Sequence, residues 1–172
     1  MSELTHRQRW IALYVLCIGT VMIVLDTTVV NVALPSIHAD LQFTETSLVW
    51  VVNAYMLTFG GFLLLGGRLA NLVGRRRMFM IGLTVFGVGS LLGGIAQSQG
   101  FLVGARALQG LGAGFASPAA LSIVTTTFAE GAERNRALGI GGAVAGAGGA
   151  AGVLLGGVLT EIDWRLVLFV NV

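Results

Sequence analysis

The sequence predicts an all-α membrane protein, and three observations carry this prediction. Apolar residues make up 55% of the 172 residues and charged residues only 10%, whereas soluble domains carry about 25% charged residues. The mean hydropathy is +0.87. Several apolar stretches are long enough to cross a bilayer as a helix, which needs about 20 residues. A water-soluble fold is therefore excluded.

The membrane-spanning helices are expected over residues 10–34, 48–67, 78–96, 101–128 and 137–160, with the start of a sixth over residues 164–172. The first stretch follows Arg7 and Arg9, as the apolar region of a signal peptide follows basic residues. It is longer than a typical signal region, however, and no small-x-small cleavage site follows it. We interpret it as a retained helix. The connections are short, so residues 1–172 are expected to form one bundle, or a piece of one.

The basic residues are all arginines, and they mark topology. Eight of the ten lie at one set of helix ends, and only Arg165 lies at the other set. The eight are Arg7, Arg9, Arg68, Arg75, Arg76, Arg77, Arg134 and Arg136. By the positive-inside rule, the N-terminus and the connections after the second and fourth helices are cytoplasmic. We therefore expect a multi-pass protein of the cell's inner (plasma) membrane, and the net charge of +2 does not indicate a nucleic-acid partner.

Glycine is frequent, at 26 of 172 residues, and its spacing matters more than its number. Glycines repeat every four residues within three predicted spans, a pattern that lets helix backbones approach closely in lipid. They are Gly89 and Gly93, Gly110 and Gly114, and Gly148, Gly152 and Gly156. The segment GAGGAAG superficially fits a dinucleotide-binding fingerprint, but it has no preceding strand. There is also no phosphate-binding loop with Gly-Lys-Ser/Thr, and no His, Cys and acidic cluster has metal spacing.

Two ionisable residues lie well inside the predicted spans, Asp26 in the first and Arg106 in the fourth. A charge at this depth costs roughly 3 kcal/mol on insertion scales, so each is a functional candidate. The two helices run in opposite directions. At 1.5 Å per residue, Asp26 lies about 12 Å from Leu34 and Arg106 about 9 Å from Gly100 at the outer ends. Because their depths match, each is the expected partner of the other.

Two interpretations of this pair remain open. The pair can be a fixed ion pair that joins two helices. Alternatively, Asp26 titrates, since burial favours the neutral acid while a nearby guanidinium favours the carboxylate, and movement between wet and dry states changes the balance. Gln109, one turn after Arg106, and Thr27, next to Asp26, can complete a polar lining or form hydrogen bonds between helices.

Four segments carry motifs in a defined order. They are DTTVVNVALP from Asp26 to Pro35, GGRLANLVGRRR with Gly67, Gly74, Arg75 and Arg76, RALQGLGAG with Arg106, Gln109, Gly110 and Gly112, and the glycine-rich stretch with Gly148, Gly152, Gly156 and Gly157. Together they resemble the fourteen-helix drug:proton antiporters of the major facilitator superfamily, the EmrB/QacA type. The resemblance covers nearly the whole chain.

The resemblance implies the N-terminal half of that fold, with five transmembrane helices and the start of a sixth. It implies proton-coupled efflux of amphipathic organic compounds, with the proton gradient as energy source and no cofactor. Its partners would be the lipid bilayer, protons, the small organic substrate and the missing C-terminal helices of the same transporter. Proton coupling and substrate binding would involve Asp26, Asn31, Arg106 and Gln109.

Two further groups of residues take roles from the resemblance. A cytoplasmic latch between the second and third helices would comprise Gly67, Asn71, Gly74, Arg75 and Arg76. The fifth helix, with Gly148, Gly152, Gly156 and Gly157, would form the tightly packed antiporter-motif helix. The chain departs from the family at Asn71, where an aspartate is usual, and at Val153, where a proline is usual.

A second hypothesis comes from a different class of protein. A truncated, non-transporting membrane protein would bind partner helices or lipid through its glycine faces. An enzyme is not expected, because neither histidine lies inside a span and no nucleophile with a base converges in the bundle.

Overall fold

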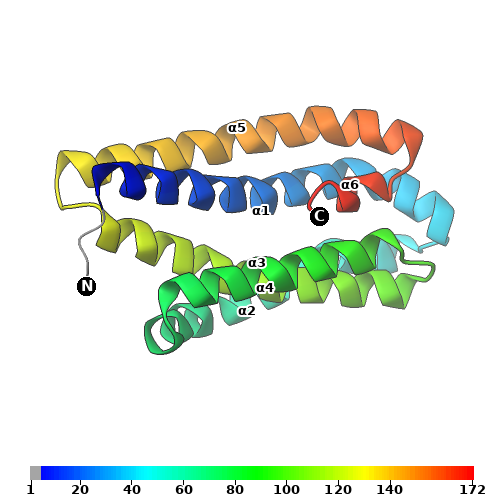
Figure 1. The fold of residues 1–172 in the computed structure, drawn as a ribbon. Helices are drawn as coiled ribbons and strands as arrows, with labels where there is room; N and C mark the ends of the chain where they lie inside the picture. The colour runs from blue at the N-terminus through cyan, green and yellow to red at the C-terminus, as the bar shows by residue number, and fades with distance from the viewer. Residues whose placement is uncertain (1–4) are drawn as a thin grey trace.

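The computed structural model describes residues 5–172, and within this range the regular structure is helical. The helices are α1 (His6–Leu41), α2 (Glu45–Val73), α3 (Arg75–Gly94), α4 (Gln99–Thr127), α5 (Ala132–Ile162) and the short α6 (Leu166–Phe169). Figure 1 shows their order along the chain. Five of them are long and apolar enough to cross a membrane. The prediction of an all-α membrane fold with five spans and a partial sixth is confirmed.

The helix starts follow local capping rules. Thr5 and Thr44 each form a capping box, in which the threonine hydroxyl accepts a backbone N–H bond from the residue three positions later. Ser98 caps α4 in the same way, through the backbone N–H of Phe101. Gly74 separates α2 from α3 with a φ of +105°, a conformation that favours glycine. The short connections therefore have defined geometry.

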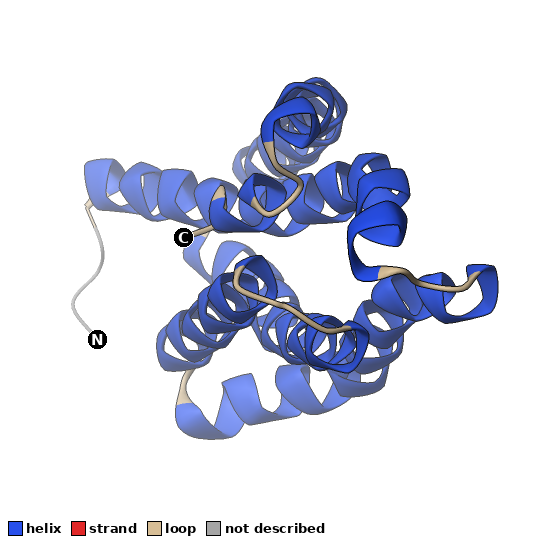
Figure 2. Cartoon of the chain, turned by 90° about the vertical axis from the view of Figure 1, so that its right-hand side faces the viewer, coloured by secondary structure: helices blue, strands red, loops and turns tan. Residues whose placement is uncertain are grey.

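The helices form two groups, shown from two sides in Figures 1 and 2. In one group α5 runs alongside α1, and the short α6 contacts α1, α5 and also α3 of the other group. In the other group α4 packs against both α2 and α3. Small residues allow these contacts: a Cβ added at Gly112 would lie 2.6 Å from the Gly82 carbonyl oxygen of α3, and one at Gly66 would collide with the Gly114 carbonyl oxygen of α4. Gly114, one of the glycines spaced four apart, is also close to a neighbouring backbone: a Cβ there would lie 3.0 Å from the Phe59 carbonyl oxygen of α2. The predicted close approach of backbones is confirmed at this position.

The two ends of the bundle differ in their connections. The start of α1 and the α2–α3 and α4–α5 connections lie at the left end in Figure 1, and the other three connections lie at the right end. The eight arginines of the sequence pattern fall at the first of these ends. The 36-residue α1 is about 54 Å long, longer than the roughly 30 Å of hydrocarbon, so its ends extend beyond the apolar layer.

The predicted spans correspond to the helices in order. Four of the predicted stretches lie within or nearly within one helix, and residues 78–96 overrun the end of α3 at Gly94 by two positions. Of residues 164–172, only Leu166–Phe169 are helical. α1 continues through Pro35 and α4 through Pro118.

The outer surface carries large apolar side chains, most prominently on α2 and α5. Leu57 and Leu64 on α2 are 68% and 89% exposed, and Leu154 on α5 is 74% exposed. Such faces are stable only when lipid or further helices cover them.

Candidate functional site: a buried carboxylate network

Asp26 and Arg106 meet in the interior, as their matched depths predict. The Nη1 of Arg106 donates a hydrogen bond to the Oδ2 of Asp26 at 2.6 Å. Asp26 is fully buried and Arg106 is 2% exposed. Two charges so far from water are tolerated only when each is paired and hydrogen-bonded. The prediction that each residue is the other's partner is confirmed.

Both oxygens of the Asp26 carboxylate accept hydrogen bonds. While Oδ2 accepts from Arg106, Oδ1 accepts from the Nε2 of Gln109 at 2.9 Å and from the Nδ2 of Asn171 at 3.0 Å. One guanidinium and two amide N–H donors therefore hold the carboxylate. This arrangement matches the ionised form, because a carboxylate only accepts hydrogen bonds.

The guanidinium of Arg106 is also fixed in place. Its Nε donates to the backbone carbonyl of Val51 on α2 at 3.1 Å, and its Nη1 also donates to the Oε1 of Gln109 at 2.7 Å. The guanidinium carbon lies 4.5 Å from the centre of the Tyr55 ring, a cation–π contact. Arg106 therefore connects α1, α2 and its own helix α4.

Ser90 on α3 is the second centre of the network. Its hydroxyl accepts from the Nε2 of Gln109 at 3.0 Å and from the Nδ2 of Asn171 at 3.3 Å, and it donates to the backbone carbonyl of Leu168 at 2.8 Å. The polar network thus joins residues from α1, α2, α3, α4 and residues 166–172, which contain α6 and are called the α6 region here. Its members are buried, so their hydrogen bonds are formed in a low-dielectric interior, where each is strong and each unmade bond is costly.

Glycines place the backbones that carry this network. A Cβ at Gly89 would lie 2.8 Å from the backbone nitrogen of Gln109, and a Cβ at Gly110 would collide with the carbonyl oxygen of Tyr55. A Cβ at Gly93 would lie 2.9 Å from the Leu168 side chain of α6. The close packing of α2 and α3 against α4, and of α6 against α3, therefore brings the donors within reach of the carboxylate.

Two polar neighbours of Asp26 do not join the network. The Nδ2 of Asn31 donates to the Thr27 carbonyl at 2.6 Å, and Asn31 is exposed. The Thr27 hydroxyl donates to the Val24 carbonyl at 2.7 Å, within α1. Each therefore bonds its own helix in this conformation, and a role for Asn31 in coupling stays a prediction. Gln109, by contrast, contacts Asp26 directly.

The predicted latch lies at the end of the bundle that holds the α2–α3 connection. Asn71 and Arg76 are exposed and Arg75 is half-buried, while Gly74 forms the sharp connection. A Cβ at Gly67 would lie 3.7 Å from Pro118 of α4, an ordinary contact. The five residues therefore share one end of the bundle, and their function as a latch stays a prediction.

The glycines of α5 divide by the face they occupy. Gly148, Gly152 and Gly156 face α1: a Cβ at Gly152 would collide with the Thr28 hydroxyl, and one at Gly156 would lie 3.1 Å from the Cα of Val29. Nothing lies within 4 Å of a Cβ at Gly157. Three of the four antiporter-motif glycines thus line the α1–α5 contact.

Three members of the network were not among the predicted site residues: Ser90, Asn171 and Tyr55. Ser90 and Asn171 carry a sequence signal, because both are polar residues in apolar stretches. An uncharged serine or asparagine is common in membrane helices, however, so the signal does not single them out. Tyr55 carries no such signal.

Long apolar helices around a buried charged network define a multi-pass membrane protein with an intramembrane ion pair. The family model of the Major Facilitator Superfamily matches residues 16–172. The chain belongs to this superfamily of transporters.

The chain is also similar to proteins whose names refer to drug resistance or export. The puromycin resistance protein of Streptomyces alboniger is 53% identical over 165 residues, which are 95% of this chain and 33% of the relative. The cephamycin export protein CmcT of Amycolatopsis lactamdurans is 55% identical over 162 residues, or 94% of this chain and 33% of the relative. The multidrug resistance protein Stp of Mycobacterium tuberculosis strain CDC 1551 is 40% identical, covering 96% of this chain and 31% of the relative. The chain thus spans about a third of the length of the relatives it matches.

Proposed function

We propose that this chain is the N-terminal part of a transporter that exports amphipathic organic compounds in exchange for protons. The observation that carries the proposal is the fully buried Asp26 carboxylate, held by Arg106 and two amides. An intramembrane acid with a defined partner is typical of proton pathways. The names of the relatives, which refer to antibiotic resistance and export, support the direction of transport.

The proposed cycle follows from the chemistry of a buried acid. The network as observed stabilises the ionised carboxylate. When the bundle rearranges and the carboxylate separates from Arg106, burial without a cation favours proton uptake. Binding of substrate and return of the guanidinium would then release the proton. The proton gradient supplies the energy, and no cofactor is needed.

The surroundings of the transporter follow from the same proposal. The chain lies in the cell's inner (plasma) membrane with its N-terminus in the cytoplasm, because the arginines gather at the end that holds the start of α1. The exposed apolar faces of α2 and α5 contact lipid and the C-terminal helices of the same transporter, which would complete the substrate cavity.

The latch and the α5 glycines take supporting roles. Gly74, Arg75 and Arg76 would stabilise one of the two alternating states from the cytoplasmic end. Gly152 and Gly156 let α5 lie directly on α1, the helix of Asp26, so sliding at this contact would accompany the change of state. Asn31, which is exposed on α1, would contribute to substrate binding.

The test uses the full-length gene product, purified and reconstituted in proteoliposomes. Puromycin and a cephamycin, after the names of two relatives, are the first compounds to try. Substrate addition should release protons from the wild-type protein, and Asp26→Asn should abolish this release in protein that is still folded. Asn135→Asp, which adds a carboxylate at the exposed start of α5, is the matched control and should release protons normally.

Three outcomes would contradict the proposal. Undiminished proton release by Asp26→Asn would show that another group carries the proton. Loss of thermal stability without loss of proton coupling in Arg106→Ala would favour the fixed ion pair. A wild-type protein that releases no protons and copurifies with another membrane protein would favour the partner-binding alternative.

A further inference from the structure

The α6 region contributes one donor to the Asp26 carboxylate, and this donor differs from the other two. Asn171 lies two residues beyond α6, and its Nδ2 reaches both the Oδ1 of Asp26 at 3.0 Å and the hydroxyl of Ser90 at 3.3 Å. The Leu168 carbonyl accepts from the same Ser90 hydroxyl at 2.8 Å. Three hydrogen bonds therefore connect the α6 region to the carboxylate site.

The two amides next to Asp26 are constrained to different degrees. Gln109 offers its Nε2 to Asp26, while its Oε1 accepts from Arg106 at 2.7 Å. Rotation of this amide by 180° would break its bond with Arg106. Within residues 5–172, no donor reaches the Oδ1 of Asn171. Asn171 can therefore rotate without losing a bond at its oxygen.

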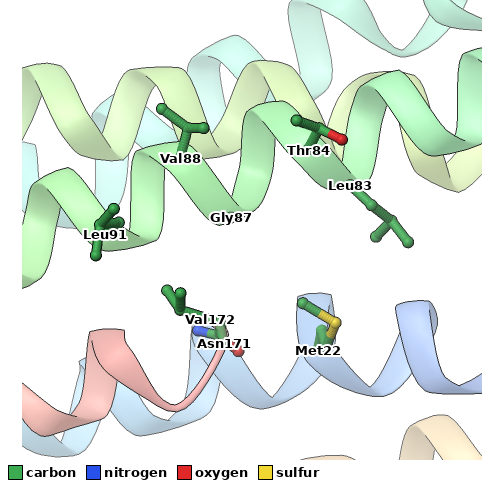
Figure 3. Close-up of a pocket in the computed structure, with 8 residues that line it drawn as sticks. All are labelled: Met22, Leu83, Thr84, Gly87, Val88, Leu91, Asn171 and Val172. Atoms are coloured by element: carbon green, nitrogen blue, oxygen red, sulfur yellow. The ribbon is translucent and has the colours of Figure 1, made fainter.

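The position of Asn171 leaves room for this rotation. Its side chain lines a hollow of about 320 Å³ between α1 and α3 and a second hollow of about 350 Å³ between α1 and α5. Figure 3 shows Asn171 at the edge of the first hollow, with Met22 of α1 beside it and Gly87 of α3 opposite. Asn171 lies between these hollows and the carboxylate, whereas Gln109 and Arg106 line neither hollow.

We propose that Asn171 is a positioning residue that serves both protonation states of Asp26. Its amide N–H bonds the carboxylate, and after rotation its carbonyl accepts the O–H of the protonated acid. This inference rests on the proposed function, because it assumes that Asp26 carries the exchanged proton. It assigns to the α6 region a direct part in setting the pH at which the proton binds.

The direction of the effect follows from the strengths of the two bonds. A hydrogen bond to an ionised group is about twice as strong as one between neutral groups. Removal of the amide therefore destabilises the carboxylate more than the acid. The charged or titratable groups facing Asp26 are Arg106 on α4 and, beneath the guanidinium, Tyr55 on α2. Ser90 on α3 and the glycine face of α5 do not titrate.

The experiment measures substrate-induced proton release by the full-length gene product in weak buffer, as a function of pH. Asn171→Leu keeps the size of the side chain and removes its donor and acceptor. The midpoint of proton release should move up by about one pH unit. Thr84→Val is the matched control: Thr84 lines the same hollow but donates to the Met80 carbonyl of its own helix. Its midpoint should equal that of the wild type.

A second substitution covers the case in which Asn171→Leu fails to fold. Asn171→Ser is too short to reach Asp26 and should give the same upward shift. A folded variant at Asn171 with the wild-type midpoint would overturn the inference, even if its thermal stability fell. If Asp26→Asn abolishes proton release while the Asn171 variants keep the wild-type midpoint, only this inference fails. If Asp26→Asn releases protons normally, the proposed function is contradicted, and this inference, which rests on it, is contradicted with it.

Discussion

The buried pair makes a quantitative prediction about stability. Arg106→Met leaves the fully buried Asp26 carboxylate with two amide donors and no cation, and Asp26→Asn leaves the guanidinium with only neutral acceptors. Removal of one partner of a buried ion pair costs about 3–5 kcal/mol. Each single variant should therefore lower the free energy of unfolding by about that amount. The double variant contains neither charge, so it should cost no more than either single variant.

The assay is a double-mutant cycle on the full-length protein, unfolded reversibly in mixed micelles of a mild and a denaturing detergent. Helix content followed against the denaturing detergent yields the free energy of unfolding for the four proteins. A cycle in which the double variant loses the sum of the two single losses would refute the reasoning, because it would show that the two charges do not depend on each other.

Two predictions concern the glycines, and each has a matched control on the same helix. Gly152→Ala should weaken the α1–α5 contact by about 1–3 kcal/mol, because the new Cβ meets the Thr28 hydroxyl, whereas Gly157→Ala should be tolerated. Thermal melting of the two variants checks this prediction. Equal melting temperatures would argue against the close contact at Gly152. Gly112→Ala should destabilise the protein, because the new Cβ collides with the backbone of α3. Gly104→Ala, where a Cβ meets nothing within 4 Å, should stabilise α4 by about 0.5–1 kcal/mol. Thermal melting checks both variants, and destabilisation by both would contradict the different packing of the two glycines.

Much of this architecture could be predicted from the order of residues alone. Apolar stretches of spanning length determine the number and order of the helices, because a chain in lipid must satisfy its backbone hydrogen bonds internally. The matched depths of Asp26 and Arg106 also determined their pairing, since position along a helix axis follows from a rise of 1.5 Å per residue. Gln109 followed from the same reasoning, because it lies one turn from Arg106.

The resemblance of four motifs added the family, and it also named residues whose place depends on the packing. Asn31 is five positions from Asp26 in the same motif, yet it bonds the Thr27 carbonyl and is exposed. Five residues turn a helix by about 500°, so Asn31 lies some 140° around α1 from Asp26. A motif along one helix therefore includes side chains on different faces.

The tertiary structure alone decided which further groups complete the network around Asp26 and Arg106. Asn171 is 145 residues from Asp26, and the Val51 carbonyl that fixes Arg106 belongs to the backbone, where sequence carries no polar signal. Their positions depend on how each helix is rotated about its axis and on which neighbours it packs against. Depth along the axis is set by the chain itself, but rotation is set by close contacts between helices, such as those at Gly89 and Gly110.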